Sequence, residues 1–373
     1  MSSKSFYIPN LNGLRFLAAF AVIIGHLEMC KSSLGIEHLL DSGIGFFEHG
    51  GGHLGVILFF VLSGFLITLL LLKEKEKYKT IAFKKFILRR ALRIWPVYFV
   101  FITIVIFFVH GIDFILEEKV NGGTLVTMYY LILPNLAMSG FGSIKFIPHL
   151  WSIGVEEQFY LIWPLLIKHL NKRWIIVVMI LLIFTIPIIP HLTDFLKIRF
   201  PEYESILKTV GKFFQYFLIN AMAVGGVLAF VFNKYGEWVR ERLPKWASIV
   251  IVIACLSPWL LGANFGFLNE FISLLLFGTL IFVTSASKPL FLLENKVISY
   301  LGKISYGLYV YHWLVSYYII YLINSKFGEV NYFIYLLGSM LGTVLVASFS
   351  YEILEKRFLK FKSKFALIKS GKV

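Results

Sequence analysis

The feature that most constrains this chain is a series of apolar stretches long enough to cross a lipid bilayer. Each approaches the roughly 20 residues that a membrane-spanning helix needs. Hydrophobic residues make up 58% of the 373 residues and charged residues only 15%, too few polar groups to cover a soluble domain. We therefore predict an all-α polytopic membrane protein with about ten transmembrane helices. The windows are 11–30, 53–72, 86–109, 149–168, 173–191, 211–232, 246–262, 268–287, 303–323 and 331–353.

The first apolar stretch is predicted to be a retained span. It ends in GHLEMCKSS and lacks the small-residue cleavage site of a secretory signal peptide.

The net charge of +15 would suit a nucleic-acid partner, but its distribution favours a topological role. Lys and Arg concentrate in the loops that would share one side of the membrane, so the positive-inside rule places both termini in the cytoplasm and no nucleic acid is expected. These basic groups are Lys4, nine from Lys73 to Arg93, the Lys168, Lys172 and Arg173 group, the Lys234, Arg240, Arg242 and Lys245 group, and seven from Lys356 to Lys372.

A further apolar stretch, TLVTMYYLILPNLAMSG at 124–140, contains Pro134 and is short for a span. Counting it as a span would move every later basic loop outside. We therefore predict that 111–148 lie outside, with 124–140 as an interfacial or re-entrant element.

The stretch LRFLAAFAVIIGHLE carries two ionisable residues, Arg15 and His26, in an apolar helix. Eleven residues make about three helical turns, so both side chains share a face and lie about 16 Å apart along the axis. Ionisable groups at membrane depth are costly and indicate function. The alternatives are a snorkelling interface charge for Arg15 and a hydrogen-bonded bundle histidine for His26.

The sequence FKKFILRRALRIWPVYF places Arg89, Arg90 and Arg93 at the start of the third span. Guanidinium groups match phosphate oxygens well, so the cluster is a candidate anion site. Topology alone also demands basic residues at a cytoplasmic helix start.

Two further helices carry polar stripes. In HLWSIGVEEQFYLIWPLL, His149, Ser152 and Glu156 share one face, while Glu157 points about 100° away. Glu156 is predicted to face a polar cavity or a cation, either for chemistry or only to hold the bundle together.

The second stripe lies in LGKISYGLYVYHWLVS and resembles the lining of a polar path, although interhelical hydrogen bonding explains it equally. Its members are Ser305, Tyr309, His312 and Ser316.

No metal site is expected. The segment EHGGGH offers Glu48, His49 and His53, but it lies in a glycine-rich loop, and Cys30 and Cys255 have no zinc-type spacing.

On these motifs the chain resembles the acyltransferase 3 family of integral-membrane O-acyltransferases. The resemblance covers most of residues 8–358, and five motifs follow one another in the family order. They are LNGLRFLAAFAVIIGH, GHLGVILFFVLSGFLI, RRALRIWP, HLWSIGVEEQFYLIWP and YLGKISYGLYVYHWLV.

The resemblance implies transfer of an acyl group, usually acetyl, from cytoplasmic acyl-CoA to a hydroxyl of a surface or exported carbohydrate, or of a lipid-linked or small-molecule acceptor. It implies His26 as the catalytic histidine, Arg15 as its partner in the motif, and Arg90 and Arg93 as holders of the donor phosphates. Glu156 is a candidate to orient His26, as a carboxylate does in a catalytic triad.

The remaining expectations concern the stripes, the domains and the compartment. Ser152, Tyr309 and His312 are expected along the substrate path. We expect a transmembrane domain over 1–358 and a basic cytoplasmic tail over 359–373, in a bacterial inner membrane. Some relatives append an extracytoplasmic esterase-like domain where this chain has its tail, so acceptor delivery is expected to rely on the membrane domain or on a partner protein.

A transporter of a lipid-linked sugar or a proton-coupled solute is the alternative function, with His26, Glu156 and His312 as a proton relay. Internal repeats, which transporters often carry, are not evident in the sequence, and the arginines suit a phosphate-bearing donor better.

Overall fold

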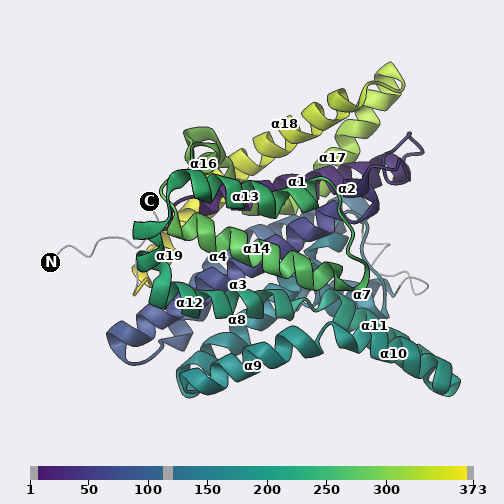
Figure 1. The fold of residues 1–373 in the computed structure, drawn as a ribbon. Helices are drawn as coiled ribbons and strands as arrows, with labels where there is room; N and C mark the ends of the chain where they lie inside the picture. Colours follow the sequence, from purple (N-terminus) through teal and green to yellow (C-terminus); the bar gives the residue numbers. More distant parts are fainter. Residues whose placement is uncertain (1–6, 112–120, 368–373) are drawn as a thin grey trace.

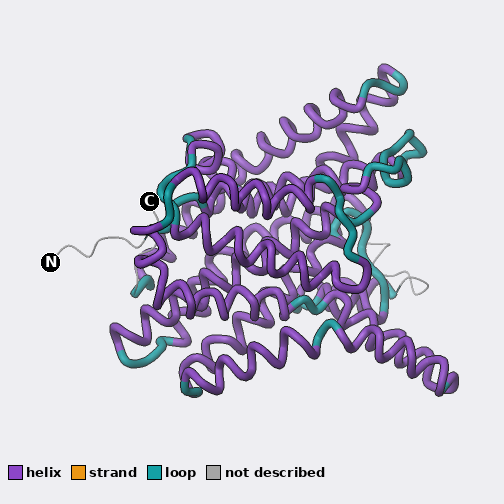
Figure 2. The backbone as a smooth tube through the Cα atoms, in the orientation of Figure 1, coloured by secondary structure: helices purple, strands orange, loops and turns teal. Residues whose placement is uncertain are grey.

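The computed structural model describes residues 7–111 and 121–367 as a bundle of helices joined by loops (Figures 1 and 2). These ranges contain no β-strand. Three parts of the predictions lie outside the described residues: Lys4, residues 112–120 of the expected external segment, and residues 368–373 of the basic tail.

Six helical segments in the described ranges are long and apolar enough to cross a membrane, as judged by length and composition. A seventh is added if α9 (Lys172–Thr185) and α10 (Ile188–Arg199), which meet at an angle of 44°, form one broken span. The chain is thus a multi-pass membrane protein. The six are α1 (Leu11–Ser33), α3 (Gly51–Tyr78), α4 (Phe83–Thr103) with a π-helical turn (Ile104–His110), α11 (Glu204–Tyr216) with α12 (Ile219–Arg242), α14 (Asn269–Ala286), and α18 (Tyr332–Ser350) with a second π-helical turn (Tyr351–Glu355) and α19 (Lys356–Lys364).

Three other predicted windows also form helices but are not among the six, so the count of ten stays a prediction. α8 (Trp151–His169) contains Glu156 and Glu157, and α17 (Ser305–Phe327) contains His312 among several Ser and Tyr residues. These polar groups lower the hydropathy of the two helices. The third, α13 (Lys245–Leu260), is apolar but shorter.

The predicted interfacial segment 124–140 consists of two short helices, α6 (Gly122–Tyr130) and α7 (Pro134–Gly140). They are separated by a turn in which Ile132 has a φ of 59°. At 1.5 Å per residue neither is long enough to span a bilayer. The other short helices are α2 (Gly45–Glu48), α15 (Phe291–Glu294), α16 (Lys296–Lys303) and the single turns Pro148–Leu150, Pro201–Tyr203 and Gly266–Leu268.

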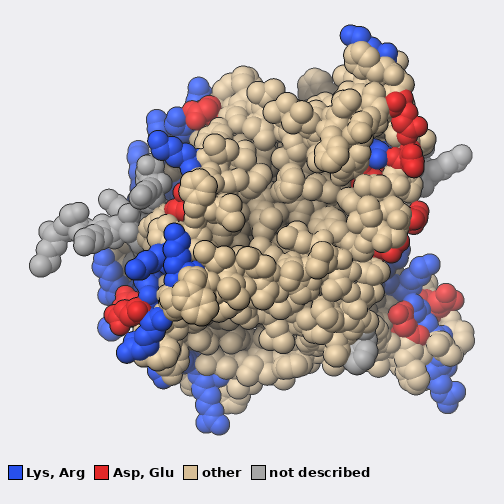
Figure 3. All heavy atoms as spheres, turned by 45° about the horizontal axis from the view of Figure 1, so that its top comes forward, with Lys and Arg blue, Asp and Glu red and all other residues tan. Residues whose placement is uncertain are grey.

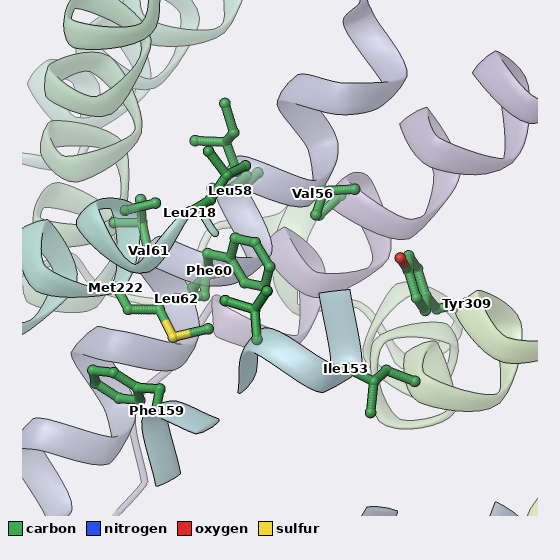
Figure 4. Packing of buried hydrophobic residues seen from close by; sticks show 14 of the residues in the cluster. Val56, Leu58, Phe60, Val61, Leu62, Ile153, Phe159, Leu218, Met222 and Tyr309 are labelled. Carbon is green, nitrogen blue, oxygen red and sulfur yellow. The ribbon is translucent and has the colours of Figure 1, made fainter. Parts of the chain in front are cut away.

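Helix α3 lies in the middle of the bundle, where it packs against α1, α8, α12 and α14. Figure 4 shows Val61 and Leu62 of α3 close to Met222 of α12. The two backbones approach closely because Gly64 faces the carbonyl of Met222 and Gly225 faces that of Val61. Small residues allow such close approach in membrane bundles, where no water drives helices together.

The basic clusters gather at one end of the bundle, whose middle carries a broad belt of uncharged side chains (Figure 3). Nζ of Lys75 at the end of α3 donates to carbonyl oxygens at the end of α8, including that of Leu170 at 3.2 Å. Glu76 accepts a hydrogen bond of 2.7 Å from Asn233 of α12. Arg89 at the start of α4 donates to the carbonyl of Phe365, which follows α19. These contacts bring together the loops that the charge pattern assigned to one side.

Candidate active site

A cavity of about 120 Å³ lies between α1, α3, α4, α8 and α17. It is several times larger than the roughly 10–15 Å³ that one water molecule needs. Its apolar wall includes Val56 of α3 and Ile153 of α8, which Figure 4 shows near Tyr309 of α17. Its charged wall is formed by Arg15, Arg90, Arg93 and Glu156.

The three cavity arginines come from two helices, Arg15 from α1 and Arg90 and Arg93 from α4. Arg15 donates to Oδ1 of Asn12 at 3.3 Å, and the Arg90 guanidinium lies 5.7 Å from the centre of the Tyr160 ring. Nε of Arg90 is buried and has no hydrogen-bond partner. Within residues 7–111 and 121–367, no carboxylate oxygen lies within 4.0 Å of these three guanidinium groups. Three cations without ion-pair partners in one cavity are suited to an anionic ligand.

Arg89 has a different role from its neighbours. It pairs with Glu74 at 3.3 Å and donates to the carbonyl of Phe365 at 2.9 Å. Its hydrogen-bonding capacity is thus largely used within the protein, and it does not line the cavity.

Glu156 lies beside Ser63 and Tyr160, within electrostatic range of Arg90 and Arg93. Ser63 and Tyr160 are themselves joined by a hydrogen bond of 2.7 Å. Glu156 thus lines the arginine cavity, and the hydrogen-bond partner of Nδ1 of His26 is His312. The pairing of Glu156 with His26 stays a prediction. The sequence contained one signal for the position of Glu156 beside Tyr160 that was not used. Tyr160 lies one helical turn after Glu156, so the two residues share a face of the helix.

His26 lies in a cluster of three histidines formed by α1, α17 and the turn before α8. Its Nδ1 is 2.7 Å from Nε2 of His312, and its ring centre is 4.2 Å from that of Trp313. The ring centres of His149 and His312 are 4.8 Å apart. His312 is completely buried, whereas His26 is partly accessible. His312 is thus the group that holds His26.

The hydrogen bonds of this cluster determine the tautomers of the neutral rings. Nδ1 of His312 lies 2.6 Å from the carbonyl oxygen of Tyr309, which can only accept, so this nitrogen carries the proton. Nε2 of neutral His312 is then an acceptor, and Nδ1 of His26 donates to it. Nε2 of His26 is left as the unprotonated nitrogen, ready to accept a proton.

The cavity and the histidine cluster are joined through Tyr309 and Ser152. The Tyr309 hydroxyl lies 2.7 Å from the Ser152 hydroxyl, and both of these residues line the cavity. The same Tyr309 hydroxyl donates to the carbonyl of His149 at 2.6 Å, while its own carbonyl accepts from His312. This places Ser152, Tyr309 and His312, the residues predicted along a path, between the arginines and His26.

A cluster of three histidines raises the question of a metal. In the part of the chain that the structure describes, no group of three or more His, Cys, Asp or Glu residues is arranged to hold a metal ion. Both ring nitrogens of His312 are hydrogen-bonded, and Nε2 of His149 donates to the carbonyl of Val310 at 3.1 Å.

Comparison with known proteins decides the family. A family model described as an acyltransferase domain, acyltransferase 3, matches residues 8–352. The chain belongs to the acyltransferase 3 family. Within this family it is similar to an O-acetyltransferase OatA of Staphylococcus aureus (strain NCTC 8325 / PS 47), with 28% identity over 94% of this chain and 57% of the relative.

It is also similar to a peptidoglycan O-acetyltransferase OatA of Listeria monocytogenes serovar 1/2a, with 29% identity over 82% of this chain and 49% of the relative. The chain therefore spans only about half the length of these relatives. No solved structure matches it.

Proposed function

We propose that this acyltransferase 3 protein transfers an acyl group, acetyl in the simplest case, from acyl-CoA to a hydroxyl of a cell-envelope carbohydrate. The observation that carries the proposal is that one helix, α1, contributes Arg15 to the arginine cavity and His26 to the histidine cluster. A donor with a phosphate end and a thioester end needs such a pair of sites.

The donor phosphates bind Arg15, Arg90 and Arg93. These guanidinium groups have no carboxylate partner within 4.0 Å in the described ranges, so the charge of a phosphate offsets their mutual repulsion. The end of the bundle that carries the basic clusters faces the cytoplasm, which is where acyl-CoA is available. The pantetheine arm extends past Ser152 and Tyr309 toward His26.

His26 is the general base. Its Nε2 takes the proton of the acceptor hydroxyl while the hydroxyl oxygen attacks the thioester carbonyl carbon. When the tetrahedral intermediate collapses, the carbon–sulfur bond breaks, the His26 imidazolium returns the proton to the sulfur, and an ester and free CoA thiol result. His312 accepts from Nδ1 of His26 throughout, which fixes the ring orientation and stabilises the imidazolium. If transfer has two steps, an enzyme hydroxyl replaces the acceptor in the first.

The acceptor is a carbohydrate hydroxyl at the outer side of a bacterial inner membrane. The support is the similarity to the Listeria relative, which is named a peptidoglycan O-acetyltransferase. This chain spans 49% of that relative.

The test uses the full chain in lipid nanodiscs with acetyl-CoA labelled in the acetyl group. We expect release of free CoA when a muropeptide or chitooligosaccharide acceptor is added, with label appearing on the acceptor. The variant His26→Ala should keep donor binding and lose release. Release by His26→Ala at the wild-type rate would overturn the role of His26. Flux of a labelled sugar across proteoliposomes without thioester consumption would instead favour the transporter.

A further inference from the structure

The C-terminal helix α19 does not extend away from the bundle as a free tail. It packs against α4, beside which Figure 1 shows it, and Arg89 of α4 donates to the carbonyl of Phe365 at 2.9 Å. The Tyr78 hydroxyl at the end of α3 donates to the carbonyl of Leu367 at 3.3 Å. The helix begins at Lys356, so it crosses the domain boundary predicted after residue 358.

One cation of α19 differs from the others. Lys360 and Lys364 are exposed, and Lys356 is exposed and pairs with Glu352 at 2.6 Å. Lys362 is partly buried, on a helix that packs against α4. Helix α4 carries Arg90 and Arg93, so the packing of α19 against α4 brings Lys362 to the end of the bundle where these arginines lie. The positive charges of Arg93, Arg90 and Arg15 also act on the Lys362 ammonium group.

Lys362 also lacks a compensating charge. Within the two described ranges, no carboxylate oxygen lies within 4.0 Å of its ammonium group. Like charges at short distance repel strongly where water is scarce, so a fourth cation beside the cavity arginines is costly unless an anion binds. The charge arrangement is therefore that of a site prepared for a highly charged ligand.

We propose that Lys362 is a fourth phosphate-binding residue and that α19 closes the arginine end of the cavity over the donor. This rests on the proposed function and extends it, because it concerns the same donor site. One phosphate monoester carries about two negative charges, so four unpaired cations match a ligand with more than one phosphate group. CoA, with a diphosphate and a ribose 3′-phosphate, belongs to that class.

The three arginines and Lys362 lie in different parts of the fold. Arg15 and the pair Arg90 and Arg93 lie on α1 and α4, whereas Lys362 lies at the end of the continuous segment Tyr332–Lys364, next to the carbonyl groups that Arg89 and Tyr78 contact. The arginines hold the phosphates, and Lys362 adds contact from the side open to the cytoplasm.

The test compares Lys362→Gln with Lys360→Gln in the full-length protein in nanodiscs. Both changes remove one positive charge from the same helix, so effects on topology and on anionic lipid are matched. Binding of CoA is measured by isothermal titration calorimetry at two salt concentrations. Binding of 3′-dephospho-CoA is measured in the same way at one salt concentration. We expect Lys362→Gln to weaken CoA binding about tenfold and to reduce its salt dependence. Lys360→Gln should stay within about twofold of wild type.

The outcomes separate the two proposals. Wild-type protein that does not bind CoA would overturn the proposed function. Wild-type protein that binds CoA, with Lys362→Gln binding equally well, would overturn only the role of Lys362. If Lys362→Gln does not fold, as judged by gel filtration and thermal melting, the variants Lys362→Arg and Lys362→Met take its place. Lys362→Arg keeps the charge and must bind CoA within about twofold of wild type. If Lys362→Arg loses as much CoA affinity as Lys362→Met does, the proposal is contradicted.

Discussion

Nδ1 of His26 lies 2.7 Å from Nε2 of His312, although 286 positions separate the two residues in the sequence. The carbonyl of Tyr309 fixes the proton on the far nitrogen of His312, so the pair has one direction: His26 donates and His312 accepts. This relationship leaves Nε2 of His26 free to act as a base.

His312 is a positioning residue, and its removal should affect turnover more than donor binding. We expect His312→Phe, which keeps a ring of similar size, to lower kcat about 10- to 100-fold, because His26 loses its acceptor and its fixed tautomer. KM for acetyl-CoA should change less than twofold. Steady-state kinetics measure both values. The variant His312→Gln, whose side-chain amide has a donor and an acceptor, should recover part of kcat; equal kcat in wild type and His312→Phe would contradict the role.

Arg93 should act in donor binding. Arg93→Ala removes one unpaired cation from the cavity, and hydrogen bonds to charged groups contribute about 1.5–3 kcal/mol. We expect KM for acetyl-CoA to rise at least about tenfold with a smaller change in kcat. Arg93→Lys keeps the charge but not the planar fork and should be intermediate. The exposed Arg242, which donates to the carbonyl of Trp238, offers a control, and Arg242→Ala should behave as wild type.

Removing the charge of Glu156 should have the opposite effect on donor binding. Its carboxylate lies near Arg90 and Arg93, where it weakens the attraction of these residues for phosphate. Glu156→Gln should therefore tighten CoA binding a few-fold in calorimetry while reducing turnover less than His26→Ala does. A loss of turnover as complete as that of His26→Ala, with CoA binding unchanged, would return Glu156 to the role of a catalytic group.

The contact between α3 and α12 should determine stability. A Cβ atom at Gly64 would overlap the backbone carbonyl of Met222, which cannot move without shifting α12. We expect Gly64→Ala to lower the free energy of unfolding by about 1–3 kcal/mol, seen as a lower melting temperature in detergent.

Gly140→Ala is the matched control for Gly64→Ala. At Gly140 the nearest atom to an added Cβ is Cγ2 of Thr209 at 3.7 Å, an ordinary contact. Equal melting temperatures for the two alanine variants would show that α3 and α12 are not held at this distance.

The sequence by itself determined the class of protein and the candidate residues. Apolar windows, loop charges and polar groups within apolar helices are local properties of the sequence. The apolar windows identified helices, and the loop charges predicted that the basic loops gather on one side. The polar groups within the helices identified Arg15, His26 and the two polar stripes. The hydropathy of α8 and α17 is low for the same reason that they were singled out: they carry the polar side chains of the site.

Only the tertiary structure decided which of these residues meet. Glu156 was the candidate to orient His26 and His312 was expected along the substrate path, and helical periodicity gives each a face but not a neighbour. The packing of α1 against α17 brings His312 to His26, whereas α8 turns Glu156 toward the arginines of α4. The same holds for Lys362, which in sequence is one lysine among several in a basic tail and in the fold is partly buried on a helix that packs against α4. Contacts between helices depend on how side chains of many separate segments pack together, and no single segment of the sequence records that.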